Sequence, residues 1–201
     1  MPNVATLPLL LKQLGLPTML RRWEELAETA QQKQWGHATY LAHLCEEEVA
    51  NRYQKREARY TKDSKLPPGK TLVTFDFSSC GSINKAQMEA LAENSGWVRQ
   101  ASNVVIFGPS GVGKTHLASA IGHHLIGQGL RVLFMSTTAL VQKLQEAKQQ
   151  YKLAEALAKL ARIPLLILDD IGYVKKTEME TSVLFELIAD RYGTARKCVI
   201  T

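Results

Sequence analysis

The first 62 residues have the hydrophobic spacing of helices. Apolar residues recur at intervals of three and four between Leu20 and Ala30, which places them on one face of a helix. Pro17 suits the first turn of that helix, and Gly36 interrupts the pattern. A second helix is predicted from about Ala38 to residue 62. The side chains predicted to face inward from it are Leu41, Leu44 and Val49. The pattern predicts a small, all-helical N-terminal region.

From residue 103 onward, short apolar runs alternate with longer amphipathic stretches. The predicted strands are 103–107, 130–135, 164–168 and 197–201. The predicted helices between them are 114–127, 138–162 with a break near Gln150, and 179–192. A shorter helix, capped by Ser82 and ending near Ala92, comes before them. Such alternation is typical of an α/β fold, in which a parallel sheet has helices on both faces.

The stretch Leu66–Lys70 contains two prolines and a glycine, which cannot continue a helix. We therefore expect a helical region over residues 1–64, a linker over 65–78 and the α/β core over 79–201. No internal repeat or low-complexity tract is visible.

Composition adds a few constraints. The formal charge is +6, which favours association with nucleic acid or another polyanion. The three cysteines lie far apart without CxxC spacing, which argues against a disulfide framework or a zinc site. No apolar run approaches the roughly 20 residues needed to cross a bilayer, and the amino terminus does not look like a signal peptide. We expect a cytoplasmic protein with no membrane partner.

The strongest motif lies between the strand 103–107 and the helix that follows it. Gly108-Pro109-Ser110-Gly111-Val112-Gly113-Lys114-Thr115 matches the P-loop pattern G-x-x-x-x-G-K-[ST] in full. Its glycines let backbone N–H groups surround phosphate oxygens, and the start of the following helix adds its dipole. Lys114 is expected to reach the β- and γ-phosphates, and the Thr115 hydroxyl to bind Mg²⁺. A chance glycine-rich turn is a poor alternative, because all four fixed positions and both flanking elements agree.

Two acids end the most apolar strand. In Leu165–Asp170, four apolar residues precede Asp169 and Asp170, so the carboxylates are expected at the C-terminal edge of the sheet, where ligands bind in such folds. Asp169 is predicted to hold Mg²⁺, and Asp170 to orient or deprotonate the attacking water. Capping of the next turn is the alternative role for Asp170.

Neither a guanine-recognition motif after the P-loop nor a transporter signature appears, so ATP is the predicted nucleotide. His116, next to the P-loop, is expected near the adenine.

A basic stripe marks the end of the second predicted helix. Arg52, Arg56 and Arg59 are spaced i, i+4 and i+7, with Lys55 and two tyrosines beside them. Such a surface suits contact with phosphates and sugars of DNA. A solvated helix face that aids solubility is the alternative, and the sequence leaves both open.

Several segments resemble one known family. Residues 10–19, Phe75-Asp76-Phe77, 113–118, 168–173 and 184–192 are similar to the IstB-type transposition helper proteins. These are AAA+ ATPases in a clade with the DnaC helicase loader and the DnaA initiator. The resemblance implies an AAA+ P-loop core behind a helical DNA-binding region, and an ATP-dependent homo-oligomer that assembles on double-stranded DNA and assists a transposase. A helicase loader, or a non-catalytic remnant that only binds nucleotide, are the alternative interpretations.

Departures from the family pattern leave ATPase activity open. Asp170 stands where many relatives carry glutamate. The sequence stops at Thr201, before the positions at which the family places its first sensor and arginine finger, and such a finger is worth about three to five orders of magnitude in rate. Arg191 precedes the last strand and is therefore not at the finger position, although it is a candidate for reaching a neighbouring subunit. We expect a truncated reading frame whose product binds ATP and hydrolyses it poorly.

Overall fold

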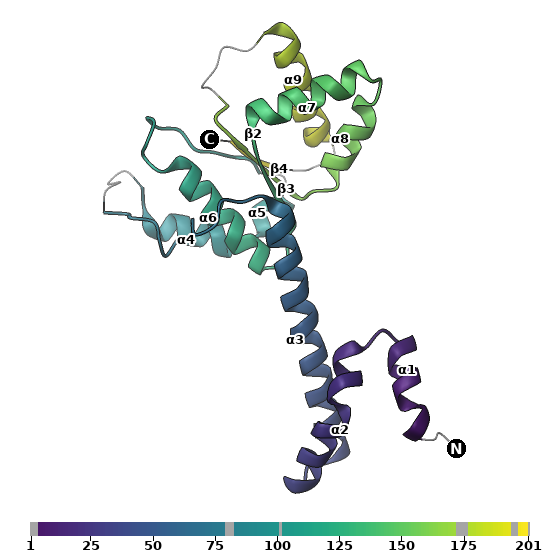
Figure 1. Ribbon diagram of the computed structural model, residues 1–201. Helices are drawn as coiled ribbons and strands as arrows, with labels where there is room; N and C mark the ends of the chain where they lie inside the picture. Colours follow the sequence, from purple (N-terminus) through teal and green to yellow (C-terminus); the bar gives the residue numbers. More distant parts are fainter. Residues whose placement is uncertain (1–3, 79–82, 101, 172–176, 194–196, 201) are drawn as a thin grey trace. The chain divides into compact units, whose positions relative to one another are not determined.

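The computed structural model describes residues 4–78, 83–100, 102–171, 177–193 and 197–200 (Figure 1). The chain divides into two compact units, Met1–Ala58 and Arg59–Thr201. The predicted cap Ser82 lies outside the described residues. The helix that follows it begins at Lys85, and there the side chain of Asn84 accepts a hydrogen bond from the Gln87 N–H (3.3 Å).

The first unit is helical, as the sequence pattern predicts. Its elements are η1 (Val4–Thr6), α1 (Leu7–Gln13), α2 (Pro17–Gln32) and α3 (His37–Ser64), the last turns of which belong to the second unit. Gly15 takes a positive φ of 67° in the turn between α1 and α2, a conformation that glycine adopts without strain. The core of the unit consists of Leu11, Met19, Leu26 and Leu44.

The prediction for the inward face of α3 is wrong at two of three positions. Leu44 is buried, but Leu41 is 57% and Val49 66% exposed. Glu48 takes the next inward position after Leu44, and it is only 3% exposed. Its carboxylate accepts hydrogen bonds from the backbone N–H groups of Thr18 (2.7 Å) and Met19 (3.2 Å) in the first turn of α2. Hydrophobic periodicity does not identify the inward face of α3, because the buried Glu48 carboxylate occupies a position where the pattern requires an apolar residue. This carboxylate caps the start of α2.

The second unit is a parallel sheet with helices on both faces, which confirms the predicted α/β class. Strands β1 (Val104–Val105), β2 (Val132–Ser136), β3 (Leu165–Asp169) and β4 (Lys197–Ile200) lie in the order β1-β4-β3-β2. One face carries α4 (Lys85–Glu93), α5 (Gly96–Arg99) and α6 (Lys114–Gly127). The other carries α7 (Thr137–Gln149), α8 (Leu153–Ala161) and α9 (Glu178–Gly193) (Figure 1).

Strand β3 is the centre of the core. All five of its residues are buried, and Leu165 and Ile167 pack with α6, whereas Leu166 and Leu168 pack with α7 and α9. Alternate side chains of a strand point to opposite faces, so one apolar run serves both layers. This burial on both faces fixes the position of Asp169, the last residue of β3.

Residues 66–75, called the strap below, pack along α6, although we expected a linker over 65–78. Leu66 is buried in the core, and its methyl groups lie about 3 Å from where a Cβ on Gly122 would be. Phe75, near the other end of the strap, is also buried. The prolines and glycine do exclude a helix here, but the apolar residues between them anchor the chain to the second unit.

Arg191 is not placed to reach a neighbouring subunit. Arg191 is 1% exposed, and its guanidinium donates to the carbonyl groups of Leu160 (3.0 Å) and Ile163 (3.2 Å). These carbonyls end α8 and lead into β3, where a helix leaves acceptors without partners. Arg191 therefore ties α9 to the entry of the central strand. Within the described residues, no helix has the length and apolar character that crossing a membrane requires.

Candidate nucleotide site

The P-loop connects β1 to α6 at the C-terminal edge of the sheet. Gly111 and Gly113 have φ values of 82° and 89°, which side-chain-bearing residues rarely adopt. A Cβ on Gly113 would also lie 2.9 Å from Cε2 of Phe75 in the strap. Glycine at position 113 is therefore required twice, for the backbone conformation and for the close approach of an aromatic ring.

Helix α6 begins directly after this loop. No side chain caps it at Gly113, and its first turn, which the structure describes in full, contains no acidic residue. The first N–H groups of a helix have no partner inside the helix, and the helix dipole favours an anion there. The start of α6 thus has the properties of a phosphate-binding site.

Lys114 lies across the loop rather than extending into solvent. Its Nζ donates a hydrogen bond to the carbonyl of Pro109 (2.8 Å), which holds the ammonium group within the curve of the P-loop. A phosphate oxygen bound in this curve would meet a full positive charge, and a charged acceptor is a stronger partner than a carbonyl. The predicted role of Lys114 in phosphate binding fits this geometry.

The two predicted magnesium residues, 54 positions apart in sequence, are in contact. The Thr115 hydroxyl donates to Oδ1 of Asp169 (3.0 Å). Asp169 is 8% exposed, and its backbone carbonyl accepts from the buried hydroxyl of Thr137 (2.8 Å). A threonine hydroxyl and a carboxylate are hard oxygen ligands of the kind Mg²⁺ prefers, together with water and phosphate oxygens. The residues present therefore fit a magnesium ion.

Asp170 follows Asp169 at the same edge of the sheet. It is exposed, and its φ of 57° is in the left-handed region, which aspartate tolerates better than most residues. Asp170 is therefore exposed to solvent directly after Asp169, at the C-terminal edge of the sheet. The role of Asp170 with the attacking water stays a prediction.

His116 has partners in the strap. Its Nε2 lies 3.0 Å from the carbonyl oxygen of Thr71 and 3.2 Å from the Thr74 hydroxyl, and its ring meets Phe75 edge-on. The sequence predicts His116 near the adenine and indicates no role for the strap in the site. The only signal from the strap was the resemblance at Phe75-Asp76-Phe77.

The four residues predicted to contact DNA are all exposed on α3. They differ in the partners that their charged groups have. Arg52 Nε donates to the buried Glu48 (2.7 Å), and its guanidinium also donates to the carbonyl of Gly15. Arg56 and Arg59 each lie over the ring of a neighbouring tyrosine, at 5.4 Å from the ring centroid. The hydrogen bonds of Arg52 thus give it a structural role. For Arg56, Arg59 and Lys55, contact with DNA stays a prediction.

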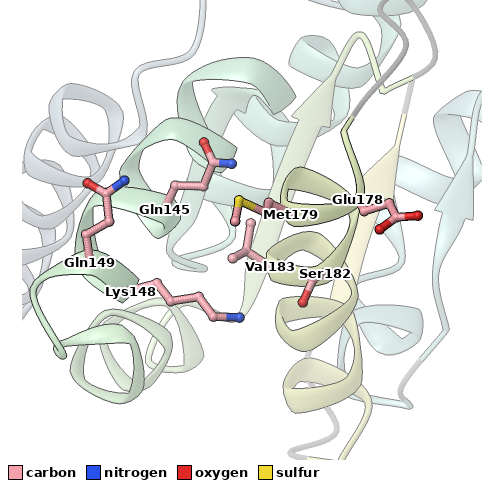
Figure 2. Close-up of a pocket in the computed structure, with 7 residues that line it drawn as sticks. All are labelled: Gln145, Lys148, Gln149, Glu178, Met179, Ser182 and Val183. Carbon is pink, nitrogen blue, oxygen red and sulfur yellow. The ribbon is translucent and has the colours of Figure 1, made fainter.

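A separate hollow of about 530 Å³ lies between α7 and α9 (Figure 2). Gln145 and Lys148 line it from α7, and Met179 and Val183 from α9. Lys148 forms an ion pair with Glu186 (2.8 Å). None of the predicted site residues lines this hollow, so the candidate site is defined by the P-loop and β3 rather than by this depression.

Comparison with known proteins agrees with this geometry. A model of the family described as IstB-like ATP binding protein matches residues 9–201. The chain belongs to the IstB-like family. The IstB-like chain is 47% identical over 188 residues to an insertion-sequence ATP-binding protein of Sinorhizobium fredii, which covers 94% of the chain and 63% of that relative. It is 36% identical to the insertion-sequence ATP-binding protein of IS21 from Pseudomonas aeruginosa, over 94% of the chain and 71% of the relative. The chain thus spans a little under two thirds of the length of the first of these relatives.

Solved structures show the fold of this IstB-like chain. DnaA from Aquifex aeolicus, bound to AMPPCP, superposes with a TM-score of 0.57 at 24% identity, over 68% of this chain and 42% of that one. The DnaC helicase loader superposes with a TM-score of 0.57 at 23% identity, over 71% of this chain and 77% of that one. This likeness confirms the predicted AAA+ P-loop fold.

Proposed function

We propose that this chain binds ATP with Mg²⁺ at Gly108–Thr115 and Asp169, and that it is a helper ATPase of DNA transposition. The contact of Thr115 with Asp169 carries the nucleotide part of this proposal (3.0 Å). This contact supports a metal position beside the P-loop, within which the Lys114 ammonium lies. The metal ion, Lys114 and the start of α6 would then all contact the same polyphosphate.

Each residue has a distinct task. The backbone of Gly108–Gly113 receives the phosphates, and Lys114 exchanges the Pro109 carbonyl for phosphate oxygens. Thr115 and Asp169 would hold Mg²⁺, which supplies charge neutralisation on the polyphosphate when bound. Asp170, exposed at the same edge, orients the water that attacks the terminal phosphate.

The transposition part of the proposal rests on the relatives and on charge. The similar proteins of Sinorhizobium fredii and Pseudomonas aeruginosa are described as ATP-binding proteins of insertion sequences. A formal charge of +6 and the exposed Arg56 and Arg59 suit contact with the backbone of double-stranded DNA. We propose that ATP-bound copies assemble as a homo-oligomer on DNA and assist a transposase there.

Calorimetry of ATP binding tests the nucleotide part. The wild-type chain is expected to bind ATP-Mg with measurable heat, and Lys114→Ala to lose at least tenfold in affinity, because a charged hydrogen bond to phosphate contributes about 1.5–3 kcal/mol. Lys143→Ala, which removes an exposed lysine of α7, is the matched control and should bind as wild type. Equal affinity of the two variants would reject Lys114 as a phosphate ligand.

A further inference from the structure

Two histidines on one face of α6 hold the strap. His116 and His123 are seven residues apart, two helical turns or roughly 10 Å along the axis. The Nε2 atom of His116 lies 3.0 Å from the Thr71 carbonyl oxygen, and that of His123 lies 3.0 Å from the Pro67 carbonyl oxygen. A carbonyl only accepts hydrogen bonds, so each Nε2 must carry a proton and donate.

The bond from His116 organises a turn of the strap. Its Nε2 is also 3.2 Å from the hydroxyl of Thr74, which in turn donates to the Gly69 carbonyl (2.7 Å). The Thr74 hydroxyl also accepts from the Thr71 N–H (3.0 Å). The Thr74 proton is thereby committed, so His116 is the donor in their contact as well. Both ends of the Thr71–Thr74 turn are attached to His116.

This turn places Phe75 against the P-loop. The residue after Thr74 is Phe75, which is 8% exposed and whose ring lies 2.9 Å from the position of a Cβ on Gly113. The ring also meets the His116 ring edge-on, at 5.2 Å between centroids and 90° between planes. His116, Phe75 and Gly113 thus form a continuous series of contacts from the strap to the residue that precedes Lys114.

We propose that His116 is a positioning residue for the nucleotide: it holds the Thr71–Thr74 turn, which keeps Phe75 against Gly113 and the phosphate-binding loop in its ATP-binding conformation. It acts through Phe75 rather than by touching the adenine, which differs from the expectation drawn from its place in the sequence. This inference rests on the proposed ATP binding. His123 holds the same strap two turns further from the loop and has no such effect.

The affinity for ATP-Mg of four chains, measured by calorimetry, tests the proposal. His116→Ala is expected to weaken binding about fivefold, the effect of losing one neutral hydrogen bond that supports the site. His123→Ala removes an equivalent bond to the strap and should change affinity less than twofold. His116→Gln keeps an N–H donor on a side chain of similar reach, so it should recover affinity to within about twofold of wild type.

A double variant tests whether the effect passes through Phe75. In a Phe75→Leu background, His116→Ala should cause no further loss, because the ring it positions is already gone. If circular dichroism shows that Phe75→Leu does not fold, Phe75→Met is used as the background instead. Additive losses would show that the effect of His116 does not pass through Phe75 and would overturn the proposal. Equal losses in His116→Ala and His123→Ala, or no rescue by glutamine, would also overturn it. Absence of binding by the wild-type chain would instead reject the proposed function.

Discussion

Glu48 is a buried carboxylate whose removal should destabilise the N-terminal unit. It accepts two backbone N–H groups at the start of α2 and a charged hydrogen bond from Arg52 (2.7 Å). The N-cap residue of α2, Leu16, offers no side-chain hydrogen bond, so Glu48 replaces the missing cap from another helix. Loss of a cap costs about 0.5–2 kcal/mol, and a hydrogen bond to a charged group contributes about 1.5–3 kcal/mol. For Glu48→Gln, which keeps size and some acceptor capacity, we predict a loss of about 2 kcal/mol.

Urea unfolding followed by tryptophan fluorescence measures this loss. Trp23 and Trp35 lie in the first unit and Trp97 in the second, so a Trp97→Phe background makes the signal report on the first unit alone. Glu46→Gln is the matched control, because the Glu46 side chain is 75% exposed and its contact is with the partly exposed His43. A midpoint shift equal to that of the control would refute the capping role of Glu48.

The pH dependence of the same variant has a definite sign. Burial of Glu48 works to raise its pKa, but the hydrogen bonds from Arg52, Thr18 and Met19 outweigh it and lower the pKa below the ordinary 4.5. A lowered pKa in the folded state means that the ionised form stabilises the fold above the unfolded pKa, and that this stability is lost as the pH falls through the folded value. The stability difference between wild type and Glu48→Gln should therefore be constant near pH 7 and shrink below pH 4.5.

Two further changes test the P-loop and the basic stripe. Gly113→Ala should lower the free energy of unfolding by about 2–3 kcal/mol, because alanine is strained at a φ of 89° and its Cβ meets Phe75; thermal unfolding that matches wild type would contradict this. The pair Arg56→Ala and Arg59→Ala should reduce the slope of log affinity for double-stranded DNA against log salt by about 1.8, at about 0.9 per phosphate contact. The control replaces Lys12 and Lys33 and so removes the same net charge elsewhere. An equal change in slope in this control would show that the effect comes from net charge and not from a DNA contact of Arg56 and Arg59.

The P-loop core could be predicted because its signals are local. The glycines, Lys114 and Thr115 are consecutive, and the apolar run before Asp169 identifies a strand buried on both faces. Parallel strands deliver their C-terminal residues to one edge, so the contact of Thr115 with Asp169 follows from topology across 54 residues. The consecutive P-loop motif and the alternation of strands and helices were sufficient for this part.

The remaining features depend on partners that the sequence does not reveal. Glu48 and Arg191 are charged residues at buried positions, and each is stable there because another helix leaves backbone groups without partners. Prolines and a glycine made the strap resemble a linker, although Leu66 and Phe75 anchor it to α6. Hydrophobic periodicity indicates how apolar one face of a helix or strand is. It does not indicate which helix end or loop packs against that face.

The dependence of ATP affinity on magnesium tests the central claim most directly. Calorimetric titrations of ATP into the wild-type chain and into Asp169→Asn, each with Mg²⁺ and with a chelator, give four affinities to compare. If Thr115 and Asp169 hold the metal beside the phosphates, wild-type affinity should fall at least tenfold without Mg²⁺, and the Asn variant should show little dependence on the metal. Wild-type binding that is the same with and without Mg²⁺, or an Asn variant that responds to Mg²⁺ as wild type does, would contradict the account.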